Sequence, residues 1–421
     1  MEFIRKTIPL RRVVVTGVGL ISPLGKTVPE NWGNLQAGRG GIARITRFDV
    51  TDHYSQMAGE VKSYDPLAHF DRKELRALDP YIQFALIAAD EAVSDSGLKL
   101  DNLDRNRAGV YVGSGIGGIS TIEANHRVLL ERGPTRVSPF FLPASIANLA
   151  TGQISIKYGL KGPNLANVTA CATSTHSVGD SFKIIQMGEA DVMLAGGAEY
   201  PITPLGMAGF SVMKALSSRN DAPEKASRPF DKERDGFVVS EGASVLVLED
   251  LEHAARRNAR IYAEIVGYGF TGDAYHMTAP DPQADGAYRS MKLAIQGGDI
   301  RETDVDYINA HGTSTPLNDK YETLAIKRLF GDHARKLPIS STKSMTGHML
   351  GATGGTEAIF TALSLYHAFI PPTINYEVPD EDCDLDYTPN AGRKLEIQYA
   401  LSNSFGFGGT NGTLLLKRFT D

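Results

Sequence analysis

Residues 12–16 read RVVVT, and the glycines Gly17 and Gly19 follow almost directly. β-Branched side chains favour extended backbone, and a short apolar run bounded by glycine predicts a buried β-strand. We therefore expect a strand at residues 12–16 that ends at Gly17. It is the first of several such runs along the chain.

Similar runs recur along the chain, and stretches with helical spacing of apolar residues lie between them. Residues 82, 86, 89 and 93 are apolar and share one face of a predicted helix that stops at Gly97. This alternation predicts α/β layering. The runs form two series that meet near residue 255, a pattern compatible with an internal duplication. The predicted strands after the first are 109–112, 191–195, 244–248, 262–266, 305–309, 337–340 and 413–416.

Length and composition fit a globular protein of 421 residues, 42% hydrophobic and 22% charged, with room for two domains. No apolar run approaches the roughly 20 residues that span a bilayer, so we expect no membrane partner. Residues 1–11 lack the apolar stretch of a signal peptide and are expected to form a short disordered leader. The net charge of −6 gives no general attraction to nucleic acid. Two cysteines exclude a disulfide framework and predict a reducing, cytoplasmic environment.

Cys171 and Cys383 are the two candidates for a nucleophilic thiol. Cys383 lies among acidic residues, which disfavour a thiolate, so we expect a surface or packing role. Cys171 precedes a predicted helix, and a helix N-terminus favours a thiolate and supplies N–H groups for an oxyanion. A buried structural cysteine would look the same, and both interpretations stay open at this point. His176 follows five residues later, about 140° around a helix, so a basic partner must come from elsewhere.

Two histidines lie among small residues at the ends of predicted strands. His311 lies in NAHGTSTP (309–316), and His348 ends STKSMTGH (341–348), which also carries Lys343. Loops at strand ends are where α/β folds place ligand-binding and catalytic residues. Either histidine alone is compatible with a solvated or structural role, but two such loops favour a site. We expect most of the other eight histidines at the surface.

Two glycine-rich segments are also informative. Residues 403–411, NSFGFGGTN, predict a mobile loop with an apolar gate, although a tight turn over a core phenylalanine is an open alternative. Residues 113–118, GSGIGG, match the GxGxxG spacing of a dinucleotide-binding turn. That fold also requires an acidic residue at the end of a second strand, whereas Glu131 lies in a helical run. The dehydrogenase interpretation therefore fails.

In combination these segments resemble the β-ketoacyl-acyl-carrier-protein synthases, most closely the fatty-acid-elongating type II branch. The resemblance covers residues 12–417 and implies a thiolase-like α/β fold, with two similar βαβαβαββ halves (12–255 and 256–421) in five layers (αβαβα). It also implies a homodimer. The implied reaction is a decarboxylative Claisen condensation of malonyl-acyl-carrier protein with an enzyme-bound acyl group, which lengthens the chain by two carbons. The matching segments are 169–171 (TAC), 228–237 (RPFDKERDGF), 309–316, 341–351 and 403–411.

The resemblance also implies a role for each site residue. Cys171 is expected to accept the acyl group, and His311 and His348 to form the catalytic pair, with electrostatic support from Lys343. No metal and no permanently bound cofactor is implied, because the phosphopantetheine arm arrives with the acyl carrier protein. The further implied residues are Glu357 and Asp319 behind the histidines, Thr313 and Thr315 at the phosphopantetheine arm, Ile116 limiting the acyl pocket, Phe407 as gate and oxyanion donor, and Arg72, Lys73, Arg76, Arg136 and Lys214 docking the acidic carrier.

Three other functions share part of this pattern. A thiolase would reverse the reaction with coenzyme A esters, but it needs a second cysteine in the glycine-rich segment 403–411, which has none. A cysteine hydrolase shares the cysteine and histidine, yet nothing indicates a site open to water. A non-catalytic subunit of a synthase pair would lack Cys171. The condensing enzyme is the interpretation that accounts for all the motifs.

Overall fold

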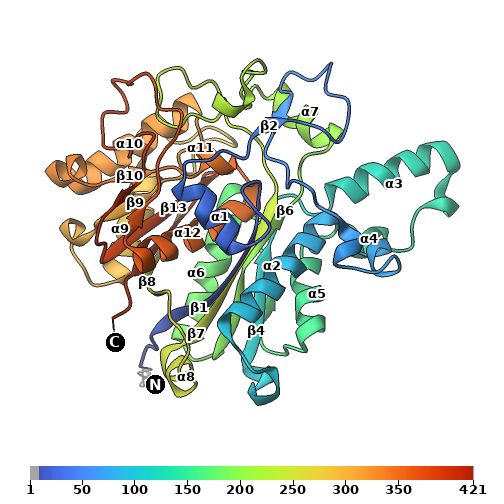
Figure 1. Ribbon diagram of the computed structural model, residues 1–421, viewed down its shortest axis with the longest axis horizontal. Helices are drawn as coiled ribbons and strands as arrows, with labels where there is room; N and C mark the ends of the chain where they lie inside the picture. The colour runs from blue at the N-terminus through green and yellow to red at the C-terminus, as the bar shows by residue number, and fades with distance from the viewer. Residues whose placement is uncertain (1–8, 421) are drawn as a thin grey trace, which may run out of the picture.

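Over residues 9–420, which the computed structural model describes, ten strands form one mixed sheet made of two equivalent halves (Figure 1). The two halves meet where β1 pairs with β8, antiparallel, over three residue pairs. From edge to centre, the first half contains β5 (Asn164–Leu165), β4 (Ala108–Gly113), β6 (Val192–Glu199), β7 (Gly242–Asp250) and β1 (Val13–Ile21). The second half contains β10 (Ile339–Ser340), β9 (Tyr307–Asn309), β13 (Tyr399–Gly406), β14 (Thr410–Lys417) and β8 (Ala263–Gly272).

The two halves repeat one topology. In each, the strand next to the edge runs parallel to both neighbours, and the remaining pairings are antiparallel. In chain order, each half has three strands of the main sheet, each followed by one or more helices, and then two strands that pair with each other; in the first half, α7 (Pro204–Val212) lies between these last two strands. The order βαβαβαββ is therefore present twice. This repetition supports the duplication that the two series of apolar runs predict.

Helices lie outside both halves of the sheet and between them. In the centre, α6 (Thr173–Gln186) contacts α12 (Thr353–His367), and both touch strands of the two halves. The outer layers contain α2 (Pro80–Ser96) with α5 (Leu149–Tyr158), and α9 (Asp285–Gly297) with α10 (Pro316–Phe330). The side chains alternate accordingly: Tyr111 packs in the central core, whereas Val110 and Val112 pack in the outer one. The layers therefore follow the order αβαβα.

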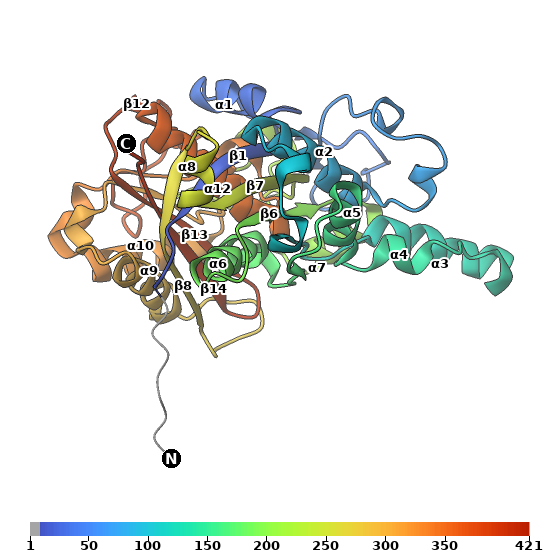
Figure 2. The ribbon, with the colours of Figure 1, turned by 90° about the horizontal axis from the view of Figure 1, so that it is seen from below.

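The remaining elements are short or lie at the periphery. Figure 2 shows α3 and α4 extending to one side of the molecule, away from the central α6. These elements are α1 (Val28–Gln36), β2 (Ala43–Arg44), β3 (Met57–Ala58), α3 (Ile119–Arg132), α4 (Phe141–Ser145), α7 (Pro204–Val212), α8 (Leu251–Arg256), α11 (Lys343–Thr346), β11 (Phe369–Ile370) and β12 (Arg393–Lys394).

Strand β1 does not end where its glycines predict. It continues through Gly17 and Gly19 to Ile21. A Cβ atom at Gly19 would overlap the carbonyl oxygen of Ala88, and one at Gly17 would overlap that of Ala92. Both carbonyl groups belong to α2. The glycines therefore allow this helix to pack directly on the strand, which is a reason for glycine inside a strand that resembles a turn signal in sequence.

The chain start can be compared with its prediction only in part. Of the predicted leader, residues 1–8 lie outside the described residues. Arg11 is already attached to the fold: its backbone N–H donates to Gln186, and its guanidinium pairs with Asp191 at 2.7 Å. The predicted division near residue 255 falls within α8. Among the described residues, none of the helices has the length and apolarity needed to cross a bilayer.

Candidate active site

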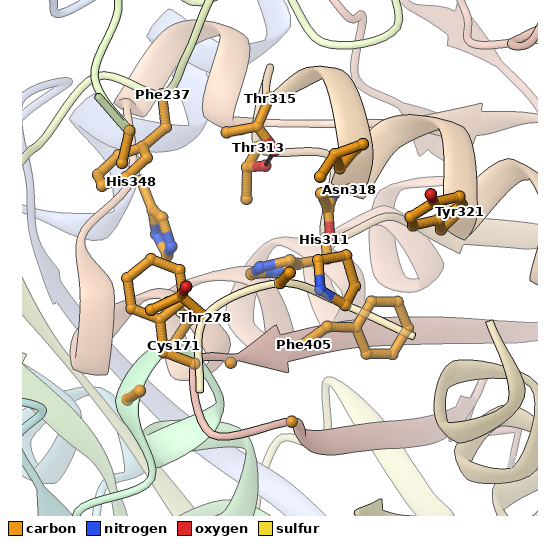
Figure 3. A pocket seen from close by; sticks show the side chains of 18 of the residues that line it. Cys171, Phe237, Thr278, His311, Thr313, Thr315, Asn318, Tyr321, His348 and Phe405 are labelled. Atoms are coloured by element: carbon orange, nitrogen blue, oxygen red, sulfur yellow. Dashed lines mark hydrogen bonds between the residues drawn. The ribbon is translucent and has the colours of Figure 1, made fainter. Parts of the chain in front are cut away.

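Among the segments that line one cavity of about 500 Å³, four carry the residues considered first (Figure 3). They are the turn before α6, the loops that follow β9 and β10, and the turn between β13 and β14. Cys171, His311 and His348 lie in the first three, and one ring nitrogen of each histidine lies within 4.8 Å of the Cys171 sulfur and of the other. The structure thus brings together the three residues that the sequence singles out. Residues 313, 315, 407 and 116 also line the cavity.

Cys171 lies in a single 3₁₀ turn, residues 170–172, directly before α6. Its side chain is 8% exposed. The expectation that the helix terminus leaves a thiolate is wrong, because burial raises the pKa of the Cys171 thiol to about 11. The positive charge of Lys343 and the backbone N–H groups of Phe407 and Cys171 lower that pKa, but they do not outweigh burial. The resting thiol is therefore protonated and neutral.

The turn that carries Cys171 has a counterpart in the second half of the chain. Residues 350–352 form the same kind of 3₁₀ turn directly before α12. Ala170 has a φ of 48° and Leu350 a φ of 46°, values that non-glycine residues rarely adopt. The central residue of this second turn is Gly351, at the position that Cys171 has in the first. Both turns reach the cavity, from opposite halves of the fold.

The rings of His311 and His348 face each other edge to face, with centroids 5.4 Å apart. Leu350 donates its backbone N–H to His348 Nδ1 at 3.3 Å, so the proton of the neutral ring lies on Nε2. Among residues 9–420, neither His348 Nε2 nor His311 Nδ1 has a hydrogen-bond partner. Burial, and next the charge of Lys343, holds the pKa of both histidines well below the usual value. Both rings are therefore neutral near pH 7.

Lys343 is buried behind these rings and pairs with Glu357 of α12 at 2.7 Å. Burial raises the pKa of Glu357 to about 7, against the effect of the Lys343 charge. The ammonium group acts on both histidines and on the thiol, and in each case it disfavours added positive charge. It therefore opposes binding of a cation between the sulfur and the two rings. A neutral or anionic ligand suits this space better.

Asp319, expected behind the histidines, holds the loop that carries His311. It is fully buried and accepts hydrogen bonds from the backbone N–H groups of Phe230 (2.8 Å) and Ser314 (3.2 Å). The carboxylate nearest to His311 is Glu322, which accepts from the backbone N–H of His311 (2.8 Å) and Gly312 (2.7 Å). Glu322 is not among the site residues predicted from the sequence. The sequence feature that indicates Glu322 is its i, i+3 spacing from Asp319, which places both carboxylates on one helix face.

The segment 403–411 is a β-hairpin with a short turn, which agrees with the tight-turn alternative and not with a long mobile loop. Strands β13 and β14 pair over eight residues, from Tyr399–Lys417 to Gly406–Thr410, and leave a three-residue turn at 407–409. Phe405, and not Phe407, packs edge-on against His311, with ring centroids 5.7 Å apart. The backbone N–H of Phe407 lies near the Cys171 sulfur. The hairpin thus brings a backbone donor to the thiol.

The turn Gly113–Gly118 does not have a free phosphate cradle. The backbone N–H groups of Gly115 and Ile116 donate to the buried carboxylate of Glu199, at 2.7 and 3.1 Å. These donors are therefore already occupied by protein. Ile116 itself lines the cavity and is 36% exposed. The structure supports the sequence argument against a dinucleotide site.

The predicted docking residues are all at the surface. Lys214 lines the mouth of the cavity, and Thr313 and Thr315 lie deeper, with their hydroxyl oxygens 2.9 Å apart (Figure 3). The five predicted docking residues that are exposed are Arg72, Lys73, Arg76, Arg136 and Lys214.

Cys383 and His176 are both buried. Cys383 is fully buried in the core of the second half, so it has the predicted packing role, and burial raises its pKa to about 12. His176 is also buried and not at the surface. Its Nδ1 lies 2.8 Å from the hydroxyl of Thr169.

Comparison with known proteins identifies the family. The profile of the β-ketoacyl synthase N-terminal domain matches residues 10–254, and that of the C-terminal domain matches residues 262–377. The chain belongs to the β-ketoacyl synthase family. This β-ketoacyl synthase is 54% identical over 411 residues to the 3-oxoacyl-[acyl-carrier-protein] synthase 2 of Coxiella burnetii, covering 98% of this chain and 99% of the relative. The corresponding protein of Staphylococcus aureus strain N315 is 53% identical over 409 residues, covering 97% and 99%.

Solved structures of β-ketoacyl synthases have the same fold. One from Burkholderia phymatum STM815 matches with a TM-score of 0.91 at 36% identity, covering 98% of this chain and all of that one. A ketosynthase in complex with the acyl-carrier protein of a type II polyketide synthase matches with a TM-score of 0.90 at 35% identity, with the same coverage. The thiolase-like α/β fold and the family expected from the sequence are confirmed. The protein is an acyltransferase, an elongating condensing enzyme of fatty-acid synthesis.

Proposed function

We propose that Cys171, His311 and His348 perform a decarboxylative condensation in which acyl carrier protein delivers both reactants on a phosphopantetheine arm. The observation that carries this proposal is the convergence of one sulfur and two imidazoles, within 4.8 Å, in a cavity of about 500 Å³; among residues 9–420, one ring nitrogen of each imidazole has no hydrogen-bond partner. The relatives at 53–54% identity, named for acyl-carrier-protein substrates, support it. The product is a β-ketoacyl chain longer by two carbons.

In the first half-reaction the Cys171 sulfur attacks the carbonyl carbon of the acyl thioester. The bond between that carbon and the phosphopantetheine sulfur breaks, and the departing thiolate takes the proton that Cys171 loses. The backbone N–H groups of Cys171 and Phe407, which lower the pKa of the thiol, stabilise the tetrahedral oxyanion. The Lys343 charge lowers the cost of ionising a buried thiol.

In the second half-reaction malonyl-carrier protein enters and its carboxylate leaves as CO₂. The electron pair of the broken C–C bond becomes an enolate, whose oxygen accepts hydrogen bonds from the neutral rings of His311 and His348. The His348 proton is already on Nε2, so this ring donates without rearrangement. The enolate carbon then attacks the acyl-cysteine carbonyl, and Cys171 leaves as a thiolate that is reprotonated. Two donors at one oxygen suit a carbanion equivalent better than a single general base does.

Mass spectrometry tests this function directly. After incubation with acyl-carrier proteins of graded chain length, we expect an acyl adduct on the Cys171 peptide alone. Adding malonyl-carrier protein should remove the adduct and yield a β-ketoacyl-carrier product two carbons longer. The Cys383 peptide is the internal control, because that thiol is fully buried. Acylation at another residue, or release of free fatty acid in place of a longer chain, contradicts the proposal and favours a hydrolase.

The exposure of the five predicted docking cations supports docking of an acidic carrier protein. Arg72, Lys73 and Arg76 lie together near one short 3₁₀ helix, and Lys214 lies at the cavity mouth. The related ketosynthase whose structure contains an acyl-carrier protein supports a protein partner of this kind. Exposed charges are screened by salt, so this surface affects the encounter rate more than the chemistry.

A second copy of the chain is the partner that the exposed apolar side chains of α3 favour. Helix α3 has no buried residue in the single chain, and Leu129 and Leu130 on it are exposed. The edge strand β5, which pairs with β4, also presents an exposed apolar side chain, Leu165. A helix without a buried face gains stability only from a partner, and we propose a homodimer that covers it. We also propose a cytoplasmic location, consistent with two free cysteines.

Ile116→Phe should change the chain-length preference. Ile116 lines the cavity close to Cys171, so a larger side chain fills space that a long acyl chain needs. Added volume in a packed site typically costs about 1–3 kcal/mol, which corresponds to roughly a tenfold to hundredfold loss for long chains. Short chains should be transferred at the rate of the original protein. Acylation rates over graded lengths measure this, and an equal loss at every length would show that Ile116 only packs.

A further inference from the structure

Glu199 is a fully buried carboxylate at the end of β6, and the reaction described above does not use it. Its two oxygens accept four hydrogen bonds. Oε1 accepts from the hydroxyl of Ser114 (3.0 Å) and the backbone N–H of Ile116 (3.1 Å). Oε2 accepts from the backbone N–H groups of Gly115 (2.7 Å) and Gly351 (2.9 Å). All four partners donate, so both oxygens of the side chain at this position must accept hydrogen bonds.

These four donors come from two segments that are far apart in the sequence. Residues 114–116 form the turn that carries Ile116, the residue at the acyl pocket. Gly351 belongs to the turn after His348, in which Leu350 donates its N–H to His348 Nδ1. The two segments are in direct contact, because a Cβ atom on Gly351 would overlap the backbone nitrogen of Gly115. One carboxylate thus fixes the wall of the acyl pocket against the turn that orients a catalytic ring.

The charge of Glu199 also reaches the nucleophile. It raises the pKa of the Cys171 thiol, whereas the Lys343 charge lowers it. Burial raises the pKa of Glu199 to about 7, against the lowering effect of its four donors. Glu199 and Lys343 therefore act on the thiol with opposite sign. A purely structural carboxylate, distant from the site, would have no such effect.

We propose that Glu199 is a positioning residue for both half-reactions, which holds the acyl pocket at Ile116 and the His348 turn in one fixed arrangement. The proposal rests on the functions assigned above to Cys171, His348 and Ile116. Through Gly115 and Ile116, Glu199 sets where the acyl chain runs. Through Gly351 and Leu350, it sets where His348 Nε2 points. Misplacing reacting groups by about 1 Å can lower a rate 10²-fold. Loss of the Glu199 carboxylate should therefore lower the rates of both half-reactions.

The test is Glu199→Gln, which keeps the shape but replaces one accepting oxygen by a donating NH₂ group. We expect acyl transfer from acyl-carrier protein and decarboxylation of malonyl-carrier protein each to fall about 10²-fold in kcat, with KM for the carrier proteins little changed. The pH midpoint of Cys171 alkylation by iodoacetamide should move to lower pH, because loss of the negative charge favours the thiolate. A substitution with a merely structural effect would not combine a lower kcat at a nearly constant KM with a shifted pH midpoint of alkylation.

The matched control is Glu91→Gln. Burial raises the pKa of Glu91 to about 7 as well, and it accepts from the backbone N–H groups of Leu20 and Val28, away from the cavity. This variant should retain both activities and the alkylation profile. If the original protein lacks acyl transfer, the proposed function fails. The positioning role is wrong if the original protein is active and the folded Glu199→Gln variant has the same rates. It is also wrong if that variant loses only one of the two half-reactions.

Ser114→Ala keeps the test decisive if the glutamine variant does not fold. It removes one donor from Oε1, on the acyl-pocket side, and leaves the bond of Gly351 to Oε2 intact. We expect a changed chain-length profile for acyl transfer with decarboxylation within twofold of the original rate. An unchanged profile, or an equal loss in both reactions, would contradict the connection of Oε1 to the acyl pocket.

Discussion

A Cys171→Gln variant should lose acyl transfer completely while it continues to decarboxylate malonyl-carrier protein. No nucleophile remains at position 171, and Cys383 cannot replace it because that thiol is fully buried in another core. The glutamine carbonyl lies near the place of an acyl-cysteine carbonyl, so the pocket resembles its acylated state. The two histidines and the Phe407 N–H are unchanged, and CO₂ release should therefore persist or rise.

Two measurements on the same preparation check this. Mass spectrometry after incubation with acyl-carrier protein should detect no adduct, and CO₂ release from malonyl-carrier protein should equal or exceed that of the original protein. Cys383→Ser is the matched control at the other cysteine, and it should retain both activities. A folded Cys171→Gln protein that releases no CO₂ would show that the cysteine takes part in decarboxylation itself.

Adding His348→Ala or His311→Ala to Cys171→Gln should reduce decarboxylation by roughly 10²–10³-fold. Each change removes one donor to the enolate oxygen, and water in the cavity does not replace a donor with a fixed direction. His348 has its proton fixed on Nε2 by the Leu350 N–H, so we expect its loss to be at least as severe as that of His311. CO₂ release under saturating malonyl-carrier protein measures the effect.

The control for these variants is His333→Ala in the same background. His333 is half-buried and its Nε2 lies 2.9 Å from the carbonyl oxygen of Val305, away from the cavity, so decarboxylation should not change. The assigned donor roles are wrong if both active-site variants keep the rate of Cys171→Gln. They are also wrong if the control loses as much as they do.

Local sequence predicted the parts of this fold that depend on local physics. Runs of β-branched residues gave strands close to their observed positions, and Gly97 stops α2 in the left-handed conformation that glycine favours. Cys171, His311 and His348 could be singled out because their neighbours are small residues at strand and helix ends. Each of these signals lies within about ten residues of the feature it predicts.

The features that the sequence missed depend on contacts between distant segments. Gly17 and Gly19 resemble a strand end, but they admit α2, which lies some 70 residues further along the chain. The segment 403–411 resembles a flexible loop because its pairing partner is not visible in its composition.

The chemistry of the site shows the same limit. The sign of the Cys171 pKa shift follows from burial, which exceeds the local effect of the helix terminus. In the sequence, Glu199 and Glu322 resemble ordinary acidic residues. Their hydrogen-bond donors come from other segments that only the fold places next to them.

The equivalent turns at 170–172 and 350–352 have a consequence for stoichiometry. A duplicated fold offers two helix ends of the same geometry, and only the first carries a sulfur atom. At the second, Gly351 admits no side chain, and its N–H is committed to Glu199. Each chain therefore holds one acyl group at a time. In the proposed reaction, the turn of the first half would therefore carry the covalent intermediate, and the turn of the second half would orient His348 toward the incoming malonyl unit.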